Sequence, residues 1–175
     1  MVTEEHARAK RPVSALLAGP YGHPLHPVLV TVPIGAWVAS LVFDIASLCV
    51  HDPAFLTRAS MWLIAVGVLG AVAAATAGLL DLVAIPAGTP AQRTALVHMT
   101  VNLLVTGAYV GGFLWRHAAG TGGSVGAGML ALSAVSLGAL GFSGYLGGKL
   151  AYRYGVRVAD ETTQAEGYTP SRPSR

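Results

Sequence analysis

Residues 60–85 read SMWLIAVGVLGAVAAATAGLLDLVAI, an apolar run that contains a single charged side chain, Asp81. A helix of about 20 such residues is long enough to cross the hydrocarbon core of a bilayer. Three more stretches reach that length, and they run from Val28 to Val50, from Arg93 to Trp115 and from Ser124 to Leu150. The sequence therefore predicts four transmembrane helices.

The composition favours a membrane protein over a water-soluble one. Hydrophobic residues make up 53% of the chain and charged residues 11%, with a mean hydropathy of +0.58, whereas soluble domains carry about 25% charged residues. Because 175 residues hold four apolar stretches with short breaks, we expect an all-α fold, a single four-helix transmembrane bundle. Cys49 is the only cysteine, which excludes an intrachain disulfide framework and a cysteine-rich metal or cluster site.

The basic residues indicate the orientation in the membrane. The formal net charge of +3 does not indicate a nucleic-acid partner, because the basic residues flank the apolar stretches and do not alternate with aromatic ones. The positive-inside rule places both termini in the cytoplasm and the protein in the cell (inner) membrane, with the lipid bilayer as its partner. The basic residues assigned to the cytoplasmic side are Arg8, Lys10, Arg11, Arg93, Lys149, Arg153 and Arg157, against Arg58 and Arg116 on the outer side.

Outside the apolar stretches the chain is polar. We expect a cytoplasmic N-terminal segment at residues 1–18, a four-helix transmembrane domain at residues 19–158 and a disordered cytoplasmic tail at residues 159–175. The tail mixes acidic residues with Pro, Ser and Thr and shows no apolar periodicity, which is typical of disordered segments.

The first candidate for a functional site is the run GHPLHP at residues 22–27, directly before the first apolar stretch. Proline is favoured in the first turn of a helix, so Pro27 predicts a helix start with His26 beside it. A helix N-terminus disfavours a protonated imidazole, and a neutral imidazole is the form that binds a metal. The alternative is a rigid helix start with interfacial histidines, His23 and His26. Pro33, further along, predicts a kink.

A second candidate, His98, lies inside the third apolar stretch. Thr94 lies four positions before it, and Asn102 and Thr106 lie four and eight positions after it, so the four polar side chains share one helix face. Polar and ionisable residues at membrane depth are costly and mark functional sites. The alternative is a structural histidine surrounded by interhelical hydrogen bonds.

Two acidic residues also fall within apolar stretches. Asp81 lies near the inner end of the second one, where a carboxylate can orient a metal-binding imidazole or bind the metal itself. Asp44 lies toward the outer end of the first one, far from the histidines. For each, the alternative is helix packing or pairing with an arginine.

A short repeat links the two histidine candidates. Gly35-Ala36-Trp37 follows His26 at the same offsets at which Gly107-Ala108-Tyr109 follows His98. If this match is not a chance one, the chain holds two tandem helical hairpins of parallel orientation, and the two histidines are equivalent. Facing imidazoles suit the axial ligation of a b-type haem. A metal ion, the alternative cofactor, would require further ligands, for which His23 and Asp81 are the candidates.

The chain resembles the domain-of-unknown-function 2231 family of predicted bacterial membrane proteins over about residues 19–158. The resemblance implies a four-helix bundle without an established activity. Some members of that family look to be fused to Rieske-type iron–sulfur domains. This sequence contains no such domain, which weakens the inference of electron transfer from the resemblance. It rests on His23-Pro24-Leu25-His26-Pro27, Val32-Pro33-Ile34-Gly35, Gly78-Leu79-Leu80-Asp81, His98 with Asn102, Gly147-Gly148-Lys149-Leu150-Ala151-Tyr152, and Gly155-Val156.

Two functions follow as hypotheses. The first is a small redox subunit that binds b-type haem, or a metal ion, between His26 and His98 in the inner leaflet and works with a redox partner protein. The alternative is a non-redox transport or assembly module with structural histidines. No nucleophile with an adjacent base is visible in the sequence, so we expect no stand-alone enzymatic activity.

Overall fold

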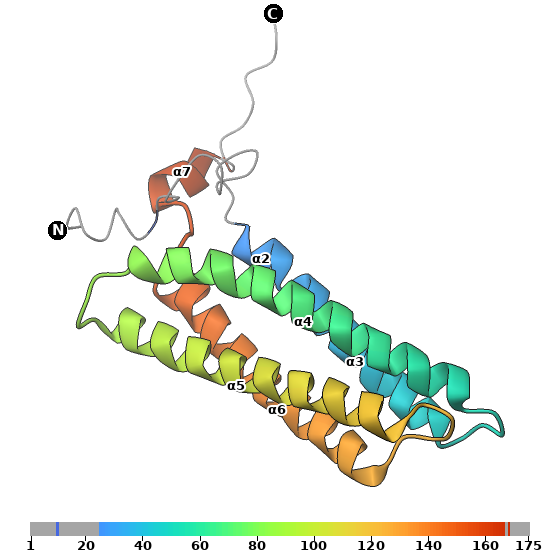
Figure 1. Cartoon of the computed structure of the whole chain (residues 1–175). Helices are drawn as coiled ribbons and strands as arrows, with labels where there is room; N and C mark the ends of the chain where they lie inside the picture. Colours follow the sequence, from blue (N-terminus) through green and yellow to red (C-terminus); the bar gives the residue numbers. More distant parts are fainter. Residues whose placement is uncertain (1–9, 11–24, 167, 169–175) are drawn as a thin grey trace, which may run out of the picture.

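The computed structural model describes Lys10, residues 25–166 and Tyr168. In this part of the chain every regular element is a helix (Figure 1). The elements are α2 (His26–Leu29), α3 (Thr31–Ser47), α4 (Ala54–Val83), α5 (Pro90–Ala119), α6 (Ala127–Gly148), the π-helix η2 (Lys149–Arg153) and α7 (Glu161–Glu166). Four continuous helical stretches are long and apolar enough to cross a membrane. The prediction of an all-α, four-helix bundle is confirmed.

Local sequence explains where the helices begin and break. Val30 separates α2 from α3, because Pro33 has no N–H to donate to the carbonyl four residues earlier and its ring crowds that carbonyl. At the start of α5, Thr89 accepts a hydrogen bond from the backbone N–H of Gln92, 3.1 Å away, and Pro90 occupies the first turn.

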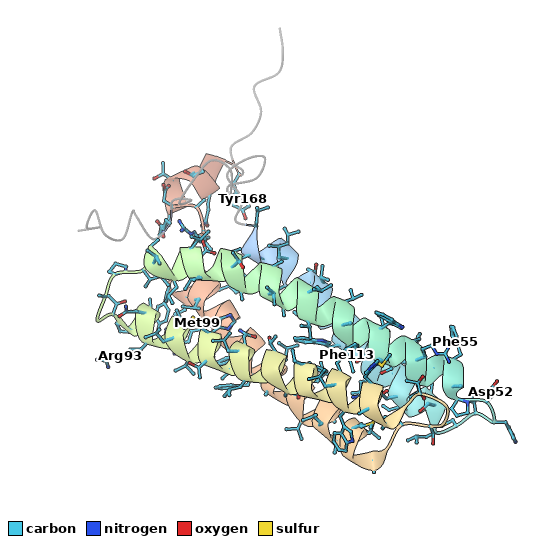
Figure 2. The ribbon with its side chains drawn as sticks, viewed as in Figure 1. Asp52, Phe55, Arg93, Met99, Phe113 and Tyr168 are labelled. Atoms are coloured by element: carbon cyan, nitrogen blue, oxygen red, sulfur yellow. The ribbon has the colours of Figure 1, made fainter. Side chains whose placement is uncertain are left out.

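The four long helices pack as two antiparallel hairpins. The first hairpin consists of α2, α3 and α4, and the second of α5, α6 and η2; α4 contacts α5 and α3 contacts α6 between them. The start of α2, the α4–α5 connection, η2 and α7 lie at one end, and the α3–α4 and α5–α6 connections lie at the other (Figure 1). We call them the basic end and the far end. Arg93 lies at the basic end, and Asp52 and Phe55 lie at the far end (Figure 2).

The bundle buries few apolar residues and exposes many. Its apolar core is a cluster of four buried residues in the middle of the bundle, namely Trp37, Ile64, Val105 and Tyr109. Leu69, Leu104 and Val135 are each about 70% exposed, at 72%, 69% and 72%. Water would penalise such a surface, whereas the hydrocarbon core of a bilayer accepts it. The distribution is that of a lipid-embedded bundle.

Glycines permit close packing along α4, whereas the glycines in the middle of α6 meet open space. A Cβ at Gly67 would lie 2.2 Å from Trp37 Nε1, and one at Gly70 would lie 2.7 Å from a methyl carbon of Val32. The glycine stripe of α6, in contrast, lies in open space at Gly138, Gly141 and Gly144. Helices α3 and α4 therefore approach each other over glycines, as expected for association in lipid.

The polar segment after η2 contains one short helix, α7. Glu161 in its first turn lies 3.5 Å from the amine of Lys10. The disordered tail predicted for residues 159–175 stays a prediction beyond this helix, since residues 169–175 lie outside the described part, as do residues 1–9 and 11–18 of the N-terminal segment.

Candidate functional site

His26 and His98 face each other across the two hairpins. His26 is the first residue of α2 and His98 lies two turns into α5. Their ring centroids are 6.4 Å apart and the ring planes are nearly perpendicular, at 82°. Both side chains are half-buried. The two candidates thus form one site toward the basic end, which we call the histidine layer.

Each imidazole is fixed by the second helix of its own hairpin. His26 Nδ1 lies 2.8 Å from the carbonyl oxygen of Ala74, and His98 Nδ1 lies 2.9 Å from that of Ser143. A carbonyl oxygen only accepts hydrogen bonds, so in the neutral form of each imidazole Nδ1 carries the proton and Nε2 keeps the lone pair. Metal-binding histidines show this arrangement, in which the second nitrogen donates to a carbonyl or carboxylate.

Glycines let the two rings approach the helix backbones. A Cβ at Gly78 would lie 3.0 Å from His26 Cε1, and a Cβ at Gly147 would lie 3.2 Å from His98 Cε1. Gly78 follows Ala74, and Gly147 follows Ser143, by one helical turn. The same local contacts therefore hold both histidines, as the predicted repeat requires.

Asn102 occupies the remaining nitrogen of His98. Its Nδ2 lies 3.1 Å from His98 Nε2 and donates to the His98 carbonyl oxygen at 2.9 Å. This donor contact agrees with an unprotonated Nε2 and a protonated Nδ1. Ser143 Oγ lies 2.9 Å from the same Nδ1, a contact that the sequence analysis missed. Because that nitrogen already carries a proton, it has no lone pair with which to activate the hydroxyl as a base.

Asp81 and Thr94, two further predicted site residues, do not join the histidine layer. Asp81 Oδ1 accepts a hydrogen bond from Arg157 Nε at 2.7 Å, which is the alternative interpretation of this acid, and backbone carbonyls orient the imidazoles instead. Thr94 donates to the Pro90 carbonyl oxygen. His23 lies outside the described residues. Within the described part of the chain, no three His, Cys, Asp or Glu side chains converge on one point.

Toward the far end, Asp44 and Arg116 form a buried ion pair. Their side chains are 0% and 1% exposed, and Arg116 also donates to Ser133 Oγ at 3.2 Å. Within the described residues, Asp44 Oδ1 and Arg116 Nε have no hydrogen-bond partner. Arg116, which the sequence context places beside the third apolar stretch as a flanking charge, lies inside the bundle, because pairing with Asp44 allows a guanidinium to be buried there. We call this pair the ion-pair layer.

Between these layers, Trp37 and Tyr109 stack with centroids 4.1 Å apart and an interplanar angle of 11°. Trp37 Nε1 donates to the Ile64 carbonyl oxygen and the Tyr109 hydroxyl to that of Ser133, both at 3.3 Å. This aromatic layer belongs to the apolar cluster in the middle of the bundle. This layer lies between the two polar layers. A proton-transport module would require a hydrated path from Asp81 to Asp44, and the stacked rings oppose such a path.

All three layers pair residues at the same sequence distance. Arg116 follows Asp44 by 72 positions, and the residue numbers give the same separation for Tyr109 after Trp37 and for His98 after His26. The sequence repeat contained the histidine and aromatic equivalences, and an extension by two helical turns beyond Trp37 and Tyr109 reaches Asp44 and Arg116. His51 and His117, in contrast, are exposed near the far end.

The family model described as Predicted membrane protein (DUF2231) matches residues 22–160. The match includes both hairpins and all three layers. The comparisons with curated proteins and with solved structures give no match. Since the family model covers most of the chain, this protein belongs to the DUF2231 family of predicted membrane proteins.

Proposed function

We propose that this membrane protein is a small redox subunit that holds a b-type haem between His26 and His98. The observation that carries the proposal is the pair of neighbouring imidazoles, each with its Nδ1 atom hydrogen-bonded to a backbone carbonyl oxygen. That bonding leaves Nε2 as the ligand atom in each ring. A bound haem would supply one-electron redox chemistry, with a redox partner protein as donor or acceptor.

The spacing of the rings supports the same proposal. His26 and His98 come from different hairpins, so a haem held by both would join the two halves of the bundle. Their ring centroids are 6.4 Å apart, which brings both imidazoles to one place. Two imidazoles are a sufficient set of protein ligands for a haem, whereas a structural zinc ion takes about four. Haem is therefore the better candidate of the two.

An absorption spectrum of the detergent-purified protein, oxidised against reduced and with added haemin, tests the proposal. We expect a Soret band in the natural chain and its loss or shift in His26→Ala and in His98→Ala. His51→Ala and His117→Ala are the matched controls, because both histidines are exposed near the far end. A natural chain that gives no Soret band even with haemin would overturn the proposal.

Asn102 provides a second test, because its amide occupies His98 Nε2 and must leave before that atom can bind iron. A hydrogen bond contributes about 0.5–1.5 kcal/mol net, so we expect Asn102→Ala to bind haemin about 2–12 times more tightly. Thr100→Ala is the control, since Thr100 is exposed on the same helix and donates to its own helix backbone. Equal haemin affinity in Asn102→Ala and the natural chain would contradict this prediction.

The second candidate function is a non-redox transport or assembly module with structural histidines. The contact of Asn102 with His98 Nε2 favours it, because both nitrogens of His98 then have partners within the protein. In that case no variant would show a haem spectrum. Asn102→Ala would lower the thermal stability of the protein.

The proposal includes the orientation, with both termini cytoplasmic in the cell inner membrane. Arg93, Lys149 and Arg153 lie toward one end, as the positive-inside rule requires of a cytoplasmic side. Cys49 is exposed toward the other end, so a membrane-impermeant maleimide should label it in intact cells. The control variant combines Cys49→Ser with Gln164→Cys, which moves the cysteine to α7 at the basic end. The maleimide should label this cysteine only after the cells are permeabilised. The reverse pattern would contradict the orientation.

A further inference from the structure

A shallow groove lies at the basic end, at the junction of α6 and η2. It is lined by Tyr145, Gly148, Lys149, Tyr152 and Arg153. Gly148 has no side chain to fill the groove, and a Cβ added there would meet only Tyr152, at 3.9 Å. Tyr145 and Tyr152 are 69% and 91% exposed. The groove therefore opens to the surroundings of the bundle and is not part of the histidine layer.

The backbone under the groove has an unusual conformation. Residues Lys149–Arg153 form a π-helix, and the Tyr154 N–H donates to the Lys149 carbonyl oxygen at 3.2 Å, five residues earlier. Such π-helical turns are rare in proteins, and those that occur often lie at functional sites. The Lys149 amine lies 5.6 Å from the centre of the Tyr154 ring, a cation–π contact that fixes the amine beside the groove.

The charge of the groove is not neutralised within the described part of the chain. The ion pairs there join Lys10 to Glu161, Arg157 to Asp81, and Arg116 to Asp44. Lys149 and Arg153 belong to none of them. Two cations between two exposed tyrosines thus face outward at a membrane end, where tyrosine prefers the headgroup region.

An exposed apolar strip leads from the middle of α6 into this groove. Val135, Phe142 and Tyr145 are separated by seven and three positions, so they share one helix face, and they are 72%, 52% and 69% exposed. The strip and the groove together present an apolar track that ends in two cations. An anionic phospholipid has the complementary shape and charge.

We infer that the groove binds the phosphate of an anionic phospholipid, with an acyl chain along Val135 and Phe142. Basic residues at a transmembrane helix end attract anionic headgroups by about 1 kcal/mol each. Lys149 and Arg153 contact the phosphate, and the tyrosines bracket the headgroup. This inference depends on membrane insertion and not on the haem proposal.

Native mass spectrometry of the detergent-purified full chain, titrated with phosphatidylglycerol or phosphatidylcholine, tests the inference. We expect phosphatidylglycerol to bind more tightly, and the double variant Lys149→Gln/Arg153→Gln to bind it about thirtyfold more weakly. Arg93→Gln at the same end (Figure 2) and Arg58→Gln in α4, close to the far end, are matched controls that should bind it as the natural chain does.

A second variant keeps the charge and removes the space. Gly148→Leu should fill the groove and weaken phosphatidylglycerol binding by a similar factor, with the helical circular dichroism of each variant as the check on folding. The inference would be overturned if the two lipids bound equally, or if Arg93→Gln weakened binding as much as the double variant. Displacement of the lipid by millimolar inorganic phosphate would also overturn it, because the site would then bind a soluble anion.

Discussion

In each of the three layers, a residue of one hairpin lies against the residue at the equivalent position of the other. The layers differ in how alike the two residues are. At the basic end, the equivalent positions hold identical residues, His26 and His98. In the middle they hold related aromatic residues, and toward the far end they hold opposite charges, Asp44 and Arg116. The paired residues therefore become less alike from the basic end to the far end.

This gradient shows what a fused pair of hairpins can do that a symmetric dimer cannot. In a dimer with a two-fold axis, a residue near the axis meets its own copy, so a buried aspartate would face a second aspartate. In one chain the two positions can hold different residues, so Asp44 meets Arg116 and the two form an ion pair. The two histidines are identical, as they would be in a symmetric dimer.

The largest expected effect comes from breaking the ion-pair layer. Arg116→Ala leaves the Asp44 carboxylate buried without its partner, and we expect a loss of about 3–5 kcal/mol of stability. Thermal unfolding in detergent measures it, with exposed Arg58→Ala as the control. Because the two positions are equivalent, the exchange Asp44→Arg/Arg116→Asp should recover more than half of the loss. An exchange variant as unstable as Arg116→Ala would contradict the equivalence.

The next effect concerns the aromatic layer. In Gly67→Ala the new Cβ would overlap the Trp37 indole, at 2.2 Å from Nε1, and must push the ring out of its stack. Overpacking of this kind costs about 1–3 kcal/mol. Gly138→Ala, where the Cβ meets open space, is the matched control in the other hairpin. Equal melting temperatures for the two variants would show that the stack contributes nothing.

A smaller effect compares the two halves of the histidine layer. The Cβ of Gly78→Ala would lie 3.0 Å from His26, and that of Gly147→Ala 3.2 Å from His98. Each should weaken one imidazole–carbonyl hydrogen bond, worth about 0.5–1.5 kcal/mol, with the larger loss for Gly78→Ala. Melting temperatures and haemin titration measure both. A loss in only one variant would show that the two histidines are held differently.

The smallest effect is expected at the exposed charges of α7. The Asp160 carboxylate accepts a hydrogen bond from the Thr163 N–H, which lowers the pKa of Asp160, and hydrogen bonding together with the nearby Lys10 lowers the pKa of Glu161. Since both carboxyl pKa values are lower in the folded state, their contribution is present above the unfolded pKa and is lost as the pH falls through the folded one.

NMR titration of the Thr163 amide should follow this loss below the ordinary carboxyl pKa, while the melting temperature of the bundle stays unchanged in Glu161→Gln. Exposed charge pairs contribute little because water and salt screen them. A large drop in melting temperature for Glu161→Gln would place α7 in the core of the fold, contrary to its exposed charges.

Local composition determined the architecture of this protein. Each predicted span coincides with a long helix, although α4 begins at Ala54, six residues before the predicted start. The agreement arises because membrane insertion depends on the summed transfer free energy of about 20 consecutive residues. The repeated offset after His26 and His98 also predicted that these two residues meet. Both signals can be read along the chain without knowing how the helices pack.

Only the tertiary structure decided which groups become partners. Arg116 has the sequence context of a flanking charge, yet it lies inside the bundle because Asp44 comes from another hairpin at the same depth. The carbonyls of Ala74 and Ser143 carry no side-chain signal, and yet they fix the imidazoles. Such partners depend on the register and rotation of packed helices, which contacts between distant residues set.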